Sequence, residues 1–227
     1  MNRTISVMKM HWRDKWVWIY VPWFILLLSF AVNLIIGISM GGEENINTGG
    51  VSSIFIYMFV CSMVIQGQTF PFALGMNVRR TDFFMGTSVM GLLVSAASAV
   101  ILFFLSVVEK LTDDWGGHLH YFIIPFMNHI SPLARLGIYF IVMVNMFFLG
   151  FVISSIYRRY KRSGIFVFSI VIFLCCSIAS FVLTYYGLWL DLFSWFSRHY
   201  MELFFWLAPL AILYALLSYG MLRRATV

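Results

Sequence analysis

Histidines and aspartates near the middle of the chain are the residues whose types and spacing best fit metal chemistry. Asp113 and Asp114 are followed by His118 and His120, and carboxylate and imidazole groups are common ligands of divalent metals. Polar residues of a loop at a membrane surface explain the same cluster, and we favour that interpretation. All five histidines lie outside the centres of the apolar stretches, so haem ligation between helices is not expected.

Other catalytic patterns are missing from the sequence. It contains no G-x-x-x-x-G-K-[ST] loop for nucleotide phosphates. No acid or histidine falls at the middle of an apolar stretch, where it could activate a serine nucleophile. The three cysteines lie in apolar runs without a C-x-x-C pair. We therefore expect no catalytic, cofactor-binding or metal-binding residues on this chain, and no enzyme activity of its own.

A few uncharged polar residues interrupt the apolar stretches. They could line a substrate pathway, but hydrogen bonds between helices are their commoner use. Gln66 and Gln68 should point to different sides of their helix. The candidates are Asn33, Gln66, Gln68 and Asn145.

Small residues recur every four positions in one apolar stretch, at Gly91, Ser95 and Ala99. This spacing places them on one helix face and lets a second backbone approach closely. We expect a helix-packing seam there, either within one subunit or between two.

The elements that must position these residues are transmembrane helices. The chain of 227 residues is 62% hydrophobic and only 11% charged, whereas soluble domains carry about 25% charged residues. A membrane-crossing helix needs about 20 predominantly apolar residues. Six stretches qualify, and residues 1–227 form a single, all-α transmembrane domain with spans at approximately 16–40, 51–75, 84–108, 132–157, 164–185 and 201–222.

The basic residues predict the orientation of these spans. With the N-terminus inside the cell, twelve of the fifteen Lys and Arg residues face the cytoplasm, and only Lys110, Arg135 and Arg198 face outward. Cytoplasmic loops of membrane proteins are enriched in Lys and Arg. We therefore expect both termini in the cytoplasm, and we attribute the net charge of +6 to membrane topology rather than to nucleic-acid binding.

Three segments outside the spans are amphipathic or aromatic. Ile5, Met8 and Trp12 form an apolar stripe that Lys9 and Arg13 avoid, which predicts a short N-terminal helix along the membrane surface. A frayed tail is the alternative. Residues 121–127 and 188–200 are too short to cross a membrane, so they are expected to be interfacial or re-entrant, serving as an external gate or as an aromatic anchor.

The stretch FPFALGMNVRRTDFFMGT, residues 70–87, joins the second and third spans. Each arginine at a bilayer centre would cost about 2.5–3.5 kcal/mol, so Arg79 and Arg80 must lie in a loop. With six spans and an N-terminal surface helix, this stretch resembles the membrane subunit of ABC-2-type transporters. Bacterial members often carry a phenylalanine-rich helix end, a basic pair, an aromatic pair and a glycine here.

That resemblance implies a function and a set of partners. The loop of Asn77, Val78, Arg79, Arg80, Thr81, Asp82 and Phe83 would dock into a separate cytoplasmic ATPase subunit, which binds ATP and magnesium. A second permease subunit, identical or related, would complete the substrate path. The protein would then be an exporter of a drug, peptide or lipid in the bacterial plasma membrane. Asp82 could cap the third span, where a negative charge suits the helix dipole.

Two other functions fit a chain of this kind. One is the substrate-binding membrane component of a vitamin-type importer, which should hold a ligand pocket near the outer face. The other is a membrane anchor or sensor that transports nothing. No residue selects a substrate.

Overall fold

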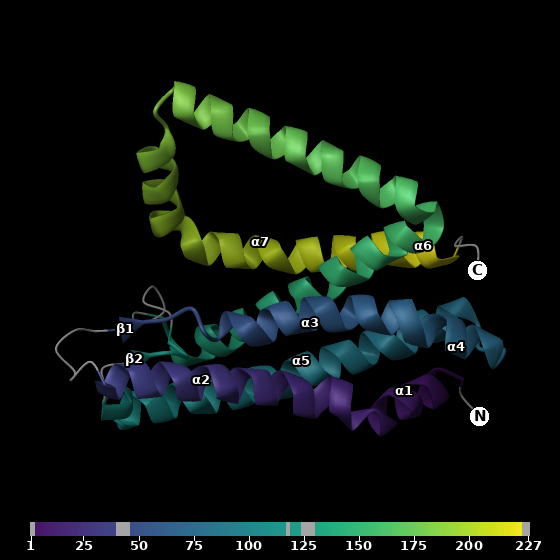
Figure 1. Ribbon diagram of the computed structural model, residues 1–227, viewed down its shortest axis with the longest axis horizontal. Helices are drawn as coiled ribbons and strands as arrows, with labels where there is room; N and C mark the ends of the chain where they lie inside the picture. The colour runs from purple at the N-terminus through teal and green to yellow at the C-terminus, as the bar shows by residue number, and fades with distance from the viewer. Residues whose placement is uncertain (1–2, 40–45, 117–118, 124–129, 224–227) are drawn as a thin grey trace.

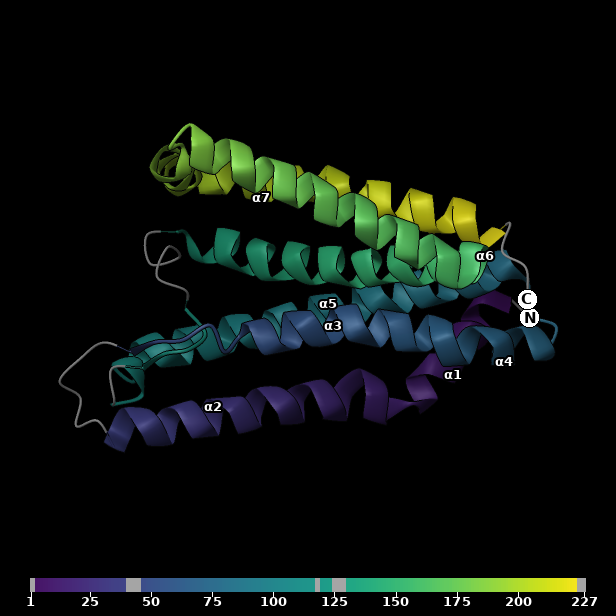
Figure 2. The same cartoon turned by 45° about the horizontal axis from the view of Figure 1, so that its top comes forward.

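A computed structural model describes residues 3–39, 46–116, 119–123 and 130–223. Long helices run along a shared axis, and the bundle has two distinct ends (Figures 1 and 2). Both chain termini lie at one end, together with the join between α4 (Phe70–Gly75) and α5 (Arg80–Leu111). We call this the arginine end. The other, which we call the loop end, carries the short parallel pair of β1 (Ile46–Asn47) and β2 (Leu119–His120).

The N-terminal residues form helix α1 (Arg3–Arg13), as the amphipathic pattern predicts. A π-helical segment, Trp16–Tyr20, and α2 (Val21–Ser39) follow it. The face of α1 that packs inward carries Val7 and His11, whereas Ile5 and Trp12 remain exposed. The apolar stripe therefore stays largely exposed, and a different face of the helix contacts the bundle.

The second apolar stretch is helical throughout but not uniform. It consists of α3 (Ser52–Val64), a π-helical segment at Ile65–Thr69 and α4. π-Helical turns interrupt the regular backbone hydrogen bonds and occur often at functional sites.

Helix α5 begins at Arg80, one turn before the expected start of the third span near Phe84, and it contains that whole span. Charged and polar residues can continue a helix into water, where they need no apolar environment. With 32 residues, α5 is about 48 Å long, which exceeds the hydrocarbon thickness of about 30 Å. After it come a short 3₁₀ turn, Asp114–Gly116, and β2.

Helix α6 (Pro132–Tyr185) contains both the fourth and the fifth expected spans. Its backbone leaves helical geometry at Lys161, where φ is 55° and ψ is −147°. The helix turns back at the arginine end, and its second half diverges from the bundle (Figure 1). A straight helix of 54 residues would extend about 80 Å, too far for one membrane crossing.

Helix α7 (Trp189–Arg223) changes direction at His199, whose φ is −111° and ψ is 17°. Its first segment stands at an angle to the remainder (Figure 1). This segment covers the aromatic stretch expected to be interfacial or re-entrant, and most of its large side chains are exposed, including Leu190 at 81%.

Five helical stretches among the described residues are long and apolar enough to cross a membrane. They are Trp16–Ser39, Ser52–Gly75, Arg80–Leu111, Pro132–Tyr185 and Met201–Arg223. Large apolar side chains remain exposed along them, such as Phe24, Phe104 and Phe173. The chain is therefore an all-α protein embedded in a membrane.

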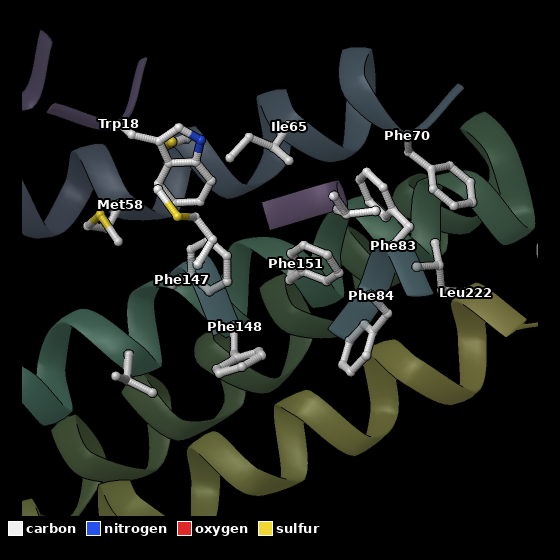
Figure 3. Packing of buried hydrophobic residues seen from close by; sticks show 14 of the residues in the cluster. Trp18, Met58, Ile65, Phe70, Phe83, Phe84, Phe147, Phe148, Phe151 and Leu222 are labelled. Atoms are coloured by element: carbon white, nitrogen blue, oxygen red, sulfur yellow. The ribbon is translucent and has the colours of Figure 1, made fainter. Parts of the chain in front are cut away.

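Buried aromatic residues hold the arginine end together. Phe83 and Phe84 of α5 pack into a cluster with residues from most of the other helices (Figure 3). Phe84 lies 5.7 Å from Phe151 and 5.2 Å from Tyr219, between ring centroids. A separate cluster at the loop end includes Leu26, Tyr121, Phe122 and Tyr139.

Helices α3 and α6 approach each other closely at Gly150. A Cβ atom there would collide with the carbonyl oxygen of Phe59 and with Ser62 Oγ, whereas one at Gly137 would meet nothing within 4 Å. We expect Gly150→Ala to lower the free energy of unfolding by about 1–3 kcal/mol through overpacking. Thermal unfolding in detergent measures this, with Gly137→Ala on the same helix as the control. Equal melting temperatures for the two variants would contradict the close contact.

Candidate functional site

The join between α4 and α5 is a tight turn of the residues Met76–Arg79. It is shorter than the expected loop of residues 77–83, because residues 80–83 form the start of α5. Asn77 adopts a positive φ of 57°, which asparagine tolerates well. The amide of Val78 donates to the carbonyl of Ala73 at 3.1 Å, so the turn folds back on α4.

Arg79 occupies the N-cap position of α5 with an extended backbone and is exposed. No side-chain hydrogen bond caps this helix among the described residues. Asp82 therefore does not act as the expected cap, although it lies in the first turn of α5, where the helix dipole favours a carboxylate.

The residues after the turn are anchored to the bundle. The ring of Phe83 is fully buried, with its centroid 5.1 Å from that of Phe70 and 6.0 Å from that of His11. Arg80 Nη1 donates to the carbonyl of Arg223 at 3.3 Å and so joins the start of α5 to the end of α7. A displacement of the turn would consequently be passed to α1, α4, α5 and α7.

Helix α1 packs directly against the first turns of α5. A Cβ atom on Gly86 would lie 2.7 Å from Val7 Cβ, so glycine permits this close approach. His11 Nε2 and Thr87 Oγ1 are hydrogen-bonded at 2.9 Å, and the imidazole ring also contacts Trp18 edge-on at 5.4 Å. Burial lowers the pKa of His11 to about 4, against a weaker opposing effect of Asp14.

We expect the stability of the folded protein to decrease as the pH falls from about 6.5 to about 4. Over this range the unfolded chain binds a proton on His11 that the folded chain does not bind, so acid favours unfolding. The loss should reach roughly 2 kcal/mol at pH 5. His11→Gln keeps a polar partner for Thr87 without titrating, and its melting temperature should vary less with pH. Identical pH profiles for both proteins would contradict this assignment.

Hydrogen bonds from α6 hold the π-helical segment Ile65–Thr69, which precedes α4. Gln66 is fully buried, and its Nε2 donates to Ser155 Oγ at 2.8 Å. Arg158 Nη2 donates to the carbonyls of Gln66 at 2.9 Å and Gly67 at 2.5 Å. Its guanidinium also lies 5.7 Å from the ring centroid of Phe70. Arg158, close to the break in α6 at Lys161, thus provides hydrogen-bond donors for carbonyls of the π-helical segment. The sequence did not indicate this role.

The other predicted polar residues lie apart from this arrangement. Asn145 Nδ2 donates to the carbonyl of Leu207 at 2.9 Å and links α6 to α7. Asn33 bonds to the carbonyl of Ser29 in its own helix, and Gln68 is exposed. The structure therefore does not bring the four residues into one pathway.

The predicted seam of small residues lies against α6 of the same chain. A Cβ atom on Gly91 would be 2.5 Å from the ring of Phe147, and Ser95 and Ala99 are buried. Glycine is needed here because the aromatic ring fills the space that a side chain would occupy.

A buried carboxylate organises the loop end. Glu109, in the last turns of α5, is fully buried and accepts hydrogen bonds from the amides of Phe122 at 2.7 Å, Ile123 at 3.1 Å and Tyr121 at 3.3 Å. Trp115 Nε1 donates to it at 3.3 Å. These contacts hold residues 121–123 of the expected gate or anchor inside the bundle, while residues 124–127 lie outside the described residues.

The candidate metal ligands only partly come together. Asp114 Oδ1 lies 3.2 Å from His120 Nδ1, and Glu109 also places an oxygen within 4.8 Å of their ligand atoms. His118 lies outside the described residues. Because four N–H groups already donate to the oxygens of Glu109, this carboxylate acts here on the loop backbone.

The burial of two charged residues, Glu109 and Arg135, could not be predicted from the sequence. Glu109 fell at the start of an expected loop, and Arg135 was expected to reach toward the membrane surface. Arg135 is instead only 3% exposed, and its Nη1 donates to Ser106 Oγ at 3.4 Å. The partners of Glu109 lie 6 to 14 positions further along the chain, and Ser106 lies 29 positions from Arg135, so helical periodicity does not reveal either contact.

No family model matches the sequence, and comparison with curated proteins and with solved structures also gives no match. The function is therefore inferred from the residues and contacts described above.

Proposed function

We propose that this chain is the membrane-spanning permease subunit of an ATP-driven ABC-2-type transporter. In this proposal the chain crosses the membrane six times, with the two halves of α6 as the fourth and fifth crossings, and both termini and the Met76–Arg79 turn lie in the cytoplasm. ATP and magnesium bind to a separate ATPase subunit, and two permease subunits enclose the substrate path. The transporter lies in the plasma membrane of a bacterium and moves its substrate out of the cell.

The observation that carries this proposal is the short, anchored turn at the arginine end. Arg79 is exposed at its tip, where it can pair with a carboxylate of the ATPase. Arg80, the next residue, is held by α7, and Phe83, one helical turn later, is held by α4 and α1. A turn of four residues has little slack, so closure of the ATPase would displace the helices rather than distort the turn.

The position of Arg158 supports the same mechanism. The π-helical segment that Arg158 contacts lies between α3 and α4 and includes Gly67. A displaced turn can bend the second span at this segment, because its backbone hydrogen bonding is already irregular. Arg158 would set how far that bend proceeds.

The vitamin-type importer is less well supported. An apolar pocket lies between α6 and α7 at the loop end, lined by residues such as Gly137, Ile141 and Phe205. Its volume of about 170 Å³ is below the 300–1,000 Å³ of typical ligand sites.

Reconstitution tests the proposed function. The ATPase encoded beside this chain should co-purify with it, and mixing the two in nanodiscs should raise the rate of ATP hydrolysis. Replacing Asn77 by Gly and Arg79 by Ser, which leaves Val78 packed against the buried cluster, should remove that stimulation without lowering the melting temperature of the membrane subunit. Full stimulation with the two residues replaced would contradict the proposal.

A further inference from the structure

A second hollow lies at the arginine end, between the last turn before the break in α6 and the final turns of α7. Its volume is about 350 Å³, and its lining includes Arg159, Arg223, Leu216 and Leu217. This volume falls within the range of known ligand sites, about 300–1,000 Å³. The hollow thus combines two cationic groups with an apolar wall.

The cationic groups are not neutralised within the described part of the chain. No carboxylate there forms an ion pair with Arg159 or Arg223. The guanidinium of Arg159 lies 5.1 Å from the ring centroid of Tyr160, and the side chain of Arg223 is exposed. The C-terminal end of α7 carries partial negative charge, but Arg80 donates to the carbonyl of Arg223 and offsets it. A ligand in the hollow therefore meets positive charge.

The apolar wall indicates what kind of anion fits. Leu216 and Leu217 are 64% and 43% exposed on α7, a helix apolar enough to cross a membrane. Arg223 lies at the C-terminal end of α7, and Arg159 lies beside it, just before the break in α6 at Lys161. If α7 crosses the membrane, both arginines lie near the headgroups at its end. Guanidinium groups bind phosphate through paired N–H donors, and basic pockets between transmembrane helices bind anionic headgroups.

We propose that this hollow is a binding site for an anionic phospholipid. The phosphate lies between Arg159 and Arg223, and an acyl chain runs along Leu216 and Leu217. Free phosphate has the same charged group but no chain to cover the leucines, so the lipid is the ligand that uses the whole lining. The site does not depend on an ATPase partner.

Native mass spectrometry of the full chain in detergent measures this binding. Phosphatidylglycerol should bind more tightly than phosphatidylcholine, and Arg159→Gln/Arg223→Gln should weaken phosphatidylglycerol binding by about thirtyfold. The matched control, Arg3→Gln/Arg13→Gln, removes two exposed arginines from α1 and should keep the preference. Arg159→Lys/Arg223→Lys retains both positive charges and should keep part of the preference for phosphatidylglycerol. This variant separates the effect of lost charge from that of misfolding.

Three results would overturn the proposal. One is equal affinity of the wild-type chain for the two lipids. Another is an unchanged preference in the Arg159→Gln/Arg223→Gln protein. The third is displacement of the lipid by millimolar inorganic phosphate, which would identify a site for free phosphate instead.

Discussion

The Arg79→Glu variant should lose at least about thirtyfold of its affinity for the ATPase subunit, because like charges facing each other at an interface cost several kcal/mol. Arg79 is the cleanest probe of docking, since it is exposed and extended at the tip of the turn. Arg80, by contrast, also contacts the carbonyl of Arg223 within the bundle. A change at Arg79 should therefore leave the fold intact.

Binding of the purified ATPase to nanodisc-embedded permease measures this effect. Arg13→Glu is the matched control, because it reverses one exposed charge on α1 without touching the turn. The melting temperatures of both variants should equal that of the wild type. An Arg79→Glu protein that binds the ATPase as tightly as the control would exclude the turn as the docking site.

Glu109→Ala should be the most destabilising single substitution at the loop end. It leaves the buried amides of Tyr121, Phe122 and Ile123 without their acceptor. Each unsatisfied buried donor costs about 1–3 kcal/mol, so the free energy of unfolding should fall by at least about 3 kcal/mol. Residues 121–123 should then leave their buried position.

Thermal unfolding in detergent and hydrogen exchange at residues 119–123 measure the two consequences. Lys110→Ala, which removes an exposed charge beside Glu109, is the control and should have little effect on either. Unchanged exchange of residues 121–123 in Glu109→Ala would show that the carboxylate does not hold this segment.

Hydropathy and helical periodicity predicted the elements of this fold well. Apolar runs of span length correspond to the long helices, and the amphipathic N-terminal pattern corresponds to α1. These signals are local, because burial in lipid depends on the residues of one helix alone. Helix α5 begins one turn before the expected span, since hydropathy marks where a chain enters lipid and not where its helix begins.

The contacts between helices could not be predicted in the same way. His11 belongs to the polar side of α1 by sequence, yet it is buried against Thr87. Arg158 was interpreted as a topology signal, but it also bonds to carbonyls of the π-helical segment. Such pairings join residues about 80 to 90 positions apart and arise only when helices pack. The docking role of residues 77–83 remains a prediction from resemblance and from the geometry of the turn.

Labelling of single cysteines in intact cells tests the proposed arrangement most directly. In a background without the three native cysteines, Val78→Cys marks the Met76–Arg79 turn, and Leu190→Cys marks the exposed first segment of α7. A membrane-impermeant maleimide should label position 190 from outside and reach position 78 only in inverted vesicles. Labelling of position 78 in intact cells would place the turn on the outer surface, out of reach of any cytoplasmic ATPase.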